Sequence, residues 1–504
     1  MPMNDIQSFL ENSGPSLASE VAEWLVSEKG LKPEAARKRL SRAQPPVRSF
    51  PVPLFPKGVR FLYLESQRTE EAFWPALQKA LRSTGSVYGL ALDGLIARQG
   101  AVRERDFSVI SGATTTPVSR QVTAKTVLER LHDSGLVDVS NLGADLVVAL
   151  KQHELGYPDT EGIKARDTVE KVILDGLREW ARNIGAASYN KIRIRGEPEL
   201  VPVGQFAFDL AGPSFLLPLN GGGSTQPGFL VADVFSEGRL DSPQIQYFIR
   251  KAKALHATMG NASILPILVA DSFTGEALTA GHAAGILMAT PGALFGKHVG
   301  ESLKILVSTL QRAAAYASSD SPDRLIGLVE NLADIEGRAR NLRGPLFELL
   351  AAYLARRDAV SIEMGVIARH PATGEQADID VLKFTAQAAE CIAIECKGRE
   401  PGGVVTTADV NHWLKKLQVV QAYLRSLPHL REAKFSFEIW TTGTFDADAL
   451  VVLQKEKKQR TKHPIDWKDG SEILRLATTH KEKAIANCLR EHFLKHPLST
   501  VRSD

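Results

Sequence analysis

The sequence predicts a multidomain α/β protein in which N-terminal helical modules precede two copies of a unit with the order αβββαβ. Three observations lead to this prediction. The chain has 504 residues, more than one hydrophobic core usually organises. Two groups of helices, one of two and one of three, lie before residue 150, and each is followed by a predicted hairpin. Beyond residue 160, helical and strand patterns recur in the same order over 160–297 and over 342–480.

Residues 1–67 have the order of a winged helix-turn-helix. Helical spacing at 19–27 and 33–43 is interrupted by Gly30, and extended stretches at 46–53 and 59–64 follow. The second helix carries four cations that suit contact with DNA phosphates: Arg37, Lys38, Arg39 and Arg42. An ordinary solvated helix face explains the same residues, so both interpretations stand.

Residues 68–150 predict a second winged helix. Helices are expected at 71–81, 86–98 and 123–134, with a closing hairpin formed by 136–139 and 144–150. Gly135 stands where a helix C-cap favours glycine. Winged helices also serve as protein-interaction modules, so the sequence leaves the partner of this segment open.

An ordered set of acids and one lysine lies within 342–480. Glu348 belongs to a predicted helix at 346–356, Asp380 to a predicted strand, and Glu395 and Lys397 to the strand at 391–397. Because side chains alternate along a strand, Glu395 and Lys397 are expected to face the same side. A hairpin between the two strands would set Asp380 beside Glu395.

Two carboxylates at the ends of buried strands require a cation, and Mg²⁺ prefers oxygen ligands with several waters retained. We therefore predict a Mg²⁺ site, with Mn²⁺ as a substitute ion, formed by Asp380, Glu395 and the main-chain carbonyl of Cys396. Lys397 would orient or help deprotonate the attacking water and offset the charge on phosphorus. A surface ion-pair cluster explains the charges individually, but it explains their order less well.

Several stretches of 342–480 resemble the Mrr-type restriction endonucleases of the PD-(D/E)xK nuclease superfamily. These are GPLFELL at 344–350, Asp380, IAIECKG at 392–398, EIWTTGTFDADAL at 438–450 and IDWKDGSEILRLA at 465–477. The resemblance implies a restriction-endonuclease-like fold with a central mixed sheet and Mg²⁺-dependent cleavage of double-stranded DNA. It also implies a catalytic set made of Glu348, Asp380, Glu395 and Lys397.

The segment 160–297 repeats the order without the lysine. Glu170 lies in a predicted helix at 167–182 and Asp209 in a predicted strand at 206–210. When the apolar strand at 229–235 is aligned with 391–397, Asp233 matches Glu395 and Phe235 matches Lys397. An aromatic ring cannot orient water, so we predict a degenerate restriction-endonuclease-like copy that contacts DNA or packs against the active copy.

An unrelated α/β domain is the alternative for this first copy. A shared spacing favours the duplication, since Phe273 and Ala277 recur as Phe445 and Ala449. Residues 298–341 are expected to be a helical connector, and 481–504 a C-terminal helix and tail.

Bulk properties narrow the function further. The net charge is +3, which permits nucleic-acid binding without requiring it. The sequence has no GxxxxGK[ST] phosphate-binding loop, no zinc-spaced Cys/His set and no apolar run long enough for a membrane span. The first residues lack the apolar core of a signal peptide, so we expect a cytoplasmic protein without a membrane partner.

The function predicted from the sequence is a Mg²⁺-dependent DNA endonuclease acting in restriction or defence against foreign DNA. One active domain per chain suggests a homodimer for cutting both strands, although sequential nicking by a monomer would also serve. A non-catalytic DNA-binding regulator on a nuclease-like scaffold and a nuclease of DNA repair remain as alternatives. The sequence does not separate DNA from RNA as the substrate.

Overall fold

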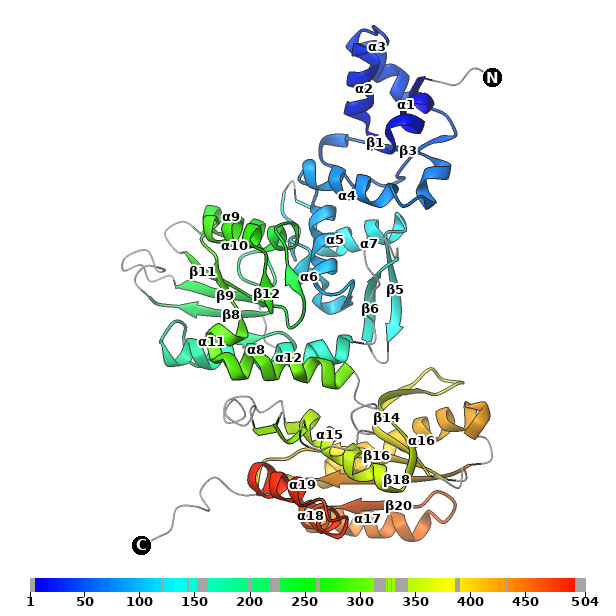
Figure 1. The fold of residues 1–504 in the computed structure, drawn as a ribbon, viewed down its shortest axis with the longest axis vertical. Coiled ribbons are helices and arrows are strands. Elements are labelled where there is room, and N and C mark those ends of the chain that lie inside the picture. Colours follow the sequence, from blue (N-terminus) through cyan, green and yellow to red (C-terminus); the bar gives the residue numbers. More distant parts are fainter. Residues whose placement is uncertain are drawn as a thin grey trace. The chain divides into compact units, whose positions relative to one another are not determined.

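The structure, a computed structural model, is mixed α/β and contains several sheets (Figure 1). The residues it describes are 5–119, 121–142, 145–151, 162–197, 202–216, 219, 227–259, 263–311, 323, 325–327, 329–330, 343–385, 390–430 and 433–494. The chain forms two compact units. Unit 1 comprises Met1–Ser140, Leu146–Ile163 and Trp180–Thr290, and unit 2 comprises Asn141–Asp145, Lys164–Glu179 and Pro291–Asp504.

The N-terminal part of unit 1 has a three-stranded sheet of order β1-β3-β2. Its elements are α1 (Asp5–Ser13), β1 (Ser16–Leu17), α2 (Ala18–Ser27), α3 (Pro33–Ser41), β2 (Val47–Ser49) and β3 (Phe61–Leu64). The α3 helix begins at Pro33, where the missing N–H of proline would have no helical partner. The sequence pattern had predicted α2, α3 and the two later strands, whereas α1 and β1 are additional.

A second small sheet has the order β4-β6-β5. The elements around it are α4 (Phe73–Ser83), α5 (Val87–Ala97), β4 (Ala101–Arg103), α6 (Phe107–Ile110), α7 (Ala124–Asp133), β5 (Val137–Leu142) and β6 (Asp145–Leu150). The α7 helix begins after Thr123, whose hydroxyl accepts the N–H of Thr126. In both small sheets the third strand lies between the first and the second.

The larger sheet of unit 1 has the order β13-β11-β9-β8-β7. The strands are β7 (Arg193–Ile194), β8 (Leu210–Ser214), β9 (Gly228–Val234), β11 (Ile264–Val269) and β13 (Leu287–Ala289). The β7–β8 and β8–β9 pairs are antiparallel, and the β9–β11 and β11–β13 pairs are parallel. The helices α9 (Gln246–Thr258) and α10 (Gly275–Ala283) lie along one side of it (Figure 1).

The β8 strand begins at Leu210, so the strand predicted at 206–210 was placed too early. Val203 and Phe206 pair in an isolated bridge instead. Asp209 precedes the strand: its side chain accepts the N–H of Val234 on β9, and its own N–H donates to the Asp233 carboxylate.

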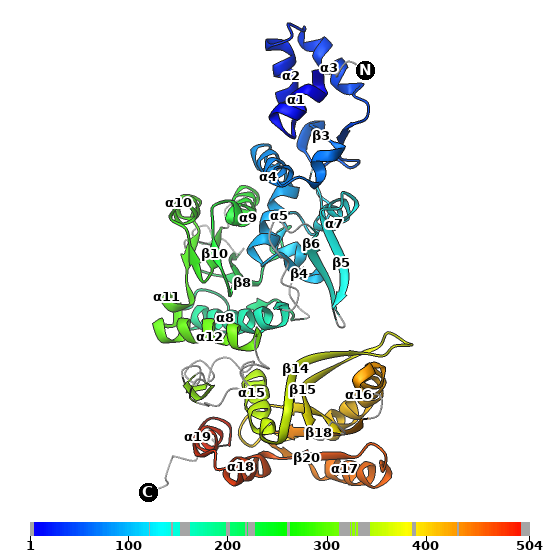
Figure 2. The same cartoon turned by 45° about the vertical axis from the view of Figure 1, so that its right-hand side comes forward.

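Unit 2 has a five-stranded sheet of order β14-β15-β16-β18-β20. The strands are β14 (Ala359–Arg369), β15 (Gln376–Thr385), β16 (Glu390–Lys397), β18 (Lys434–Thr441) and β20 (Ile465–Lys468). The first two pairs are antiparallel and the last two are parallel, as in the larger sheet of unit 1. The β14–β15 hairpin extends well beyond the other strands (Figure 2).

Helices precede and follow the strands of this second sheet. They are α15 (Arg343–Ala355), α16 (Thr407–Ser426), α17 (Ala447–Gln459), α18 (Gly470–Thr479) and α19 (Lys483–Cys488), followed by a π-helical turn at Leu489–Leu494. In the middle of the chain lie α8 (Ile163–Asn183), α11 (Pro291–Phe295) and α12 (Lys297–Gln311). The predicted connector stretch 313–321 and most of the loop 221–228 fall outside the described residues.

Each five-stranded sheet is accompanied by a short parallel strand pair. In unit 1, β10 (Arg239–Leu240) pairs with β12 (Ser272–Phe273), and in unit 2, β17 (Val404–Val405) pairs with β19 (Thr444–Phe445). The residue after each second strand caps the following helix: Thr274 accepts the N–H of Ala277, and Asp446 accepts that of Ala449. The recurring Phe-x-x-x-Ala spacing therefore marks a strand end followed by a capped helix.

Buried apolar side chains tie the segments of unit 1 together. One cluster includes residues from the small second sheet, such as Val102 and Val148, from α6, such as Val109, and from the larger sheet, such as Val231 and Leu268. A separate cluster in unit 2 packs β15, β16 and β18 against α16 and α17. Within the described residues, no helix is both long enough and apolar enough to span a membrane.

Candidate active site

Strand pairing in unit 2 brings Asp380 next to Glu395. The β15–β16 ladder ends with Val381 opposite Ile394, and one step further along the two strands lie Asp380 and Glu395. At that step a side-chain hydrogen bond replaces the backbone pairing: Asp380 Oδ2 accepts the N–H of Cys396 at 2.7 Å. The spacing of fifteen residues thus corresponds to neighbouring positions on antiparallel strands.

Glu395 and Lys397 lie on the same face of β16. The Lys397 Nζ donates to Glu395 Oε1 at 2.8 Å, and Glu395 is only 5% exposed. A second ammonium reaches the same oxygen from α16, where Lys416 Nζ lies 3.2 Å from Glu395 Oε1. Lys416 is not among the residues that the sequence pattern indicates. Its only signal is its place three residues after the buried Trp413 and one before the buried Leu417.

The Glu348 carboxyl group on α15 lies within electrostatic range of this cluster. Burial raises the pKa of Glu348, and the charge of Glu395 raises it further. Burial, followed by the charges of Glu348 and Glu395, raises the pKa of Asp380 to about 8. The structure therefore brings Asp380, Glu395 and Lys397 together, with Glu348 near enough to raise the pKa of Asp380.

Lys397 and Cys396 differ in the groups that they could present to a substrate or a metal ion. Burial by itself would lower the pKa of Lys397, but the charge of Glu395 and its hydrogen bond raise the pKa overall. Lys397 is thus an ammonium, suited to binding negative charge and orienting water rather than removing protons. Burial also raises the pKa of the Cys396 thiol well above its usual range, which leaves its main-chain carbonyl as the only candidate ligand atom of that residue.

The donor atoms of the cluster fit a hard divalent cation. The negative charges of Glu348 and Glu395 raise the pKa of Asp380, and a bound cation would offset their repulsion; oxygen donors are the preferred ligands of Mg²⁺. Within the described residues, no three His, Cys, Asp or Glu side chains form a metal site by themselves. A metal ion here would therefore depend on Asp380, Glu395, the Cys396 carbonyl and water.

The larger sheet of unit 1 repeats the hydrogen bond that holds Asp380. Asp209 Oδ2 accepts the N–H of Val234 at 2.9 Å, as Asp380 Oδ2 accepts that of Cys396. Because Val234 follows Asp233 and Cys396 follows Glu395, the bond aligns Asp233 with Glu395 and Phe235 with Lys397. Matching these two hydrogen bonds therefore pairs the same residues as the sequence comparison does.

In the larger sheet of unit 1, the carboxylates of Asp209 and Asp233 are enclosed by buried cationic side chains. Arg98, from the C-terminal end of α5, donates to Asp209 Oδ2 at 2.6 Å, and Arg195 lies 3.1 Å from the same carboxylate. Lys251 on α9 donates to Asp233 Oδ2 at 2.6 Å. Although burial raises the pKa of Asp209, the charges of Arg195 and Arg98 hold it below its usual value.

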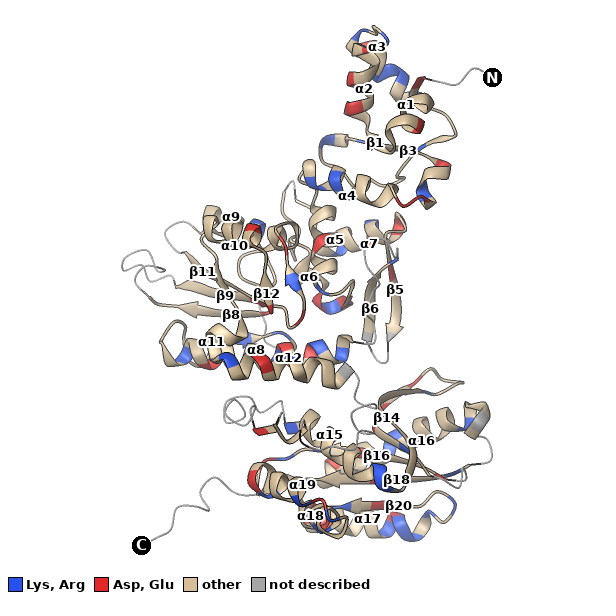
Figure 3. Ribbon diagram, viewed as in Figure 1, with Lys and Arg blue, Asp and Glu red and all other residues tan. Residues whose placement is uncertain are grey.

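The predicted DNA-contacting cations belong to α3 and to the residue that follows it, in a segment where Figure 3 colours Lys and Arg blue. Arg37, Lys38 and Arg42 are exposed, and Arg39 pairs with Asp5 at 2.7 Å. Arg37 also lines a groove of about 810 Å³ between α2, α3 and residues 57–60. These positions are accessible to a ligand, but nothing in their geometry distinguishes DNA from a protein.

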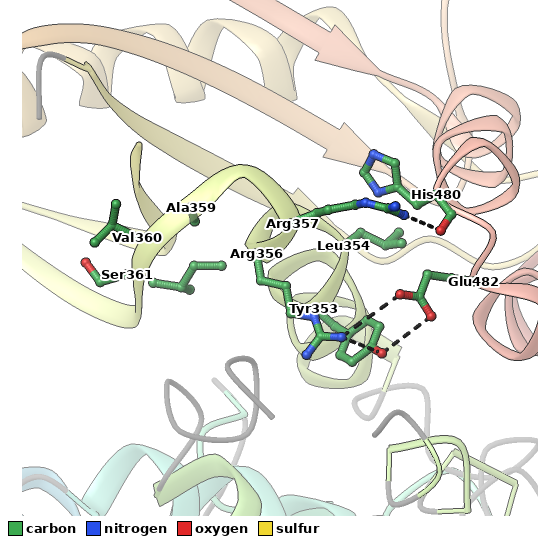
Figure 4. A pocket seen from close by; sticks show the side chains of 10 residues that line it. Tyr353, Leu354, Arg356, Arg357, Ala359, Val360, Ser361, His480 and Glu482 are labelled. Atoms are coloured by element: carbon green, nitrogen blue, oxygen red, sulfur yellow. Dashed lines mark hydrogen bonds and ion pairs between the residues drawn. The ribbon is translucent and has the colours of Figure 1, made fainter. Parts of the chain in front are cut away.

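A polar cavity of about 430 Å³ lies at the end of α15 (Figure 4). Its two arginines are engaged inside the protein. The Arg356 guanidinium lies 3.9 Å from the ring centroid of Tyr353 and within 4.0 Å of Glu482, and Arg357 donates to the carbonyl of His480. The cavity walls thus connect α15 to the segment between α18 and α19.

Comparison with known proteins adds little to this geometry. No protein-family model and no curated protein matches the sequence. Among solved structures, that of the restriction endonuclease FokI bound to DNA is 11% identical and covers 58% of this chain and 65% of its own, with a TM-score of 0.15. A TM-score of that size carries no argument about fold or function.

Proposed function

We propose that unit 2 contains a Mg²⁺-dependent DNA endonuclease of the PD-(D/E)xK class, similar to the Mrr-type enzymes. The observation that carries the proposal is the joint position of Asp380 and the Glu395–Lys397 pair at the end of the β15–β16 ladder. Acidic side chains and one ammonium at a strand end are the groups that phosphodiester hydrolysis requires.

In this proposal Asp380, Glu395 and the carbonyl of Cys396 hold Mg²⁺, for which Mn²⁺ can substitute. When bound, such an ion polarises the phosphate and lowers the pKa of a coordinated water. Glu348 adds a third carboxylate that can accept a proton or orient a water molecule. Lys397, already an ammonium, stabilises the additional negative charge that phosphorus carries while water attacks and the P–O bond breaks.

The larger sheet of unit 1 is proposed to be a degenerate copy of the same domain. The shared strand order, the equivalent aspartate hydrogen bond and the Phe235 replacement support this assignment. Its enclosed carboxylates would leave it a structural or DNA-contacting role. The two small sheets, with their common order, are proposed to be winged-helix modules that hold double-stranded DNA, with Arg37, Lys38, Arg39 and Arg42 at the phosphates.

The biological role we propose is restriction or defence against foreign DNA, with a homodimer cutting the two strands. This role follows from the resemblance to Mrr-type enzymes, and a repair nuclease would share the same site. A non-catalytic DNA-binding regulator is the competing function, and the enclosed Asp209 and the aromatic Phe235 of the larger sheet in unit 1 are the observations that favour it.

Incubation of supercoiled plasmid with the purified chain and Mg²⁺ tests the proposal directly. We expect nicking or linearisation that disappears with EDTA and in Lys397→Ala. Cleavage that persists in both controls would come from a contaminant, and no cleavage by the unaltered chain over a range of Mg²⁺ and Mn²⁺ concentrations would favour the regulator.

A further inference from the structure

The Glu395 carboxylate is bonded to two lysines rather than one. Lys397 from its own strand and Lys416 from α16 both donate to Oε1, at 2.8 and 3.2 Å, and neither bond uses Oε2. The carboxylate is therefore fixed on one side from two directions. Such a pair of bonds restricts the rotation of a side chain whose other oxygen would face a metal ion.

The larger sheet of unit 1 has a counterpart of the helix lysine Lys416 but none of the strand lysine Lys397. Lys251 on α9 donates to Asp233 as Lys416 on α16 donates to Glu395, while Phe235 replaces Lys397. Where the strand lysine is missing, the helix lysine still holds the central-strand carboxylate. A lysine on this helix can therefore hold the central-strand carboxylate without a strand lysine beside it.

The surroundings of the two helix lysines differ. Lys251 has no exposed side-chain surface and also donates to the carbonyls of Val109 and Ala207. Lys416 is 22% exposed and lines a groove of about 310 Å³ together with Asp378 and His412. The same side-chain contact is thus sealed in unit 1 and open to solvent in unit 2.

We propose that Lys416 is a positioning residue for Glu395, which keeps the carboxylate in place when Lys397 turns away to the phosphate of the substrate. A single lysine could not do both, because leaving Glu395 would release the carboxylate that the metal ion needs. This role rests on the proposed nuclease function. It adds a residue that neither the sequence pattern nor the resemblance assigns.

Metal binding and cleavage by full-length variants test the role. Lys416→Met removes the ammonium, Lys416→Arg retains the charge, and Lys415→Met is the matched control, because Lys415 is exposed on the same helix and lines the same groove. In calorimetry, Lys416→Met should bind Mn²⁺ about tenfold more weakly than the unaltered chain, which is the usual effect of losing a group that orients a metal ligand.

The Mg²⁺ concentration for half-maximal plasmid cleavage should rise by a similar factor in Lys416→Met and recover in Lys416→Arg. Should Lys416→Met lose its fold, Lys416→Gln provides the comparison, since an amide donates a hydrogen bond without carrying charge. Cleavage by the unaltered chain with equal Mn²⁺ affinity in Lys416→Met and Lys415→Met would overturn the role alone. Absence of cleavage by the unaltered chain would overturn the proposed function and this role with it.

Discussion

The guanidinium of Arg98 lies over the ring of Phe235, 4.6 Å from its centroid. Phe235 occupies the position that corresponds to Lys397, and Arg98 also bonds to Asp209, the counterpart of Asp380. An internal cation thus neutralises the acidic residue in the sheet that lacks the strand lysine. Arg98 is 4% exposed and Asp209 is fully buried, so this neutralisation is permanent in the folded chain.

Removal of the Arg98 charge should destabilise unit 1 strongly. Arg98→Met leaves Asp209 buried with fewer counter-charges, and breaking one side of a buried pair typically costs about 3–5 kcal/mol. Chemical denaturation of the variant should report that loss in the free energy of unfolding. The double variant Arg98→Met/Asp209→Asn should recover part of it, and a double variant as unstable as the sum of both single changes would argue against the coupling.

The Lys251–Asp233 bond should be equally important for folding. Lys251→Met leaves the Asp233 carboxylate without its ammonium, although Tyr247 still donates to it at 3.0 Å. We expect a loss of about 3 kcal/mol or more, the usual effect of an uncompensated buried charge. Lys253→Met, on the exposed face of the same helix, is the matched control, and equal melting temperatures of the two variants would contradict the prediction.

In the absence of metal, Asp380 should make the stability of unit 2 depend on pH. Its pKa in the folded chain is raised to about 8, so the folded state binds a proton more tightly than the unfolded state does. The resulting stabilisation is complete below the pKa of the unfolded chain, near 4, and is lost as the pH rises from there towards 8.

Asp380→Asn removes this dependence. In EDTA at pH 8 the variant should melt a few degrees above the unaltered chain, about the shift that one or two kcal/mol produces. Mg²⁺ should stabilise the unaltered chain and have little effect on the variant, which should also fail to cleave DNA. A melting temperature of the variant below that of the unaltered chain in EDTA would contradict the assignment of Asp380 as a strained carboxyl group.

Phe235 should be dispensable for cleavage. We expect Phe235→Ala to retain activity unless folding suffers, but the ring is 1% exposed and packs against Tyr247, so its removal creates a cavity. Phe235→Leu preserves more of the packing and is the better test of activity. Loss of cleavage in Phe235→Leu at unchanged thermal stability would show that the larger sheet of unit 1 takes part in catalysis.

The sequence was informative where chemistry is local. Apolar alternation and the order of acids predicted strands close to β15 and β16, and a hairpin was enough to place Asp380 beside Glu395. Capping residues give equally local signals, as the Asp446 and Thr274 caps explain the spacing that suggested the duplication. In each case the determining contacts lie within one hairpin or one helical turn.

Contacts between distant segments left weaker signals. Arg98 and Asp209 are 111 residues apart in sequence, and no periodicity connects the end of one helix to the residue before a strand in another segment. Lys251 had a detectable signal, since it lies on the buried face of α9 one turn from Tyr247 and Leu255, where a lysine requires a buried partner. The identity of that partner depends on tertiary packing.

The hydrogen bond between Lys251 and the carbonyl of Val109 limits where the chain can be cut into separately folding fragments. Lys251 Nζ donates to it at 2.9 Å, and the side chains around it belong to the same apolar cluster as the larger sheet of unit 1. An expression fragment beginning near residue 160 would lose this acceptor and Arg98, and it would expose the apolar surface that α5 and α6 cover. Such a fragment should aggregate, whereas an N-terminal cut placed before α4 would leave these partners in place.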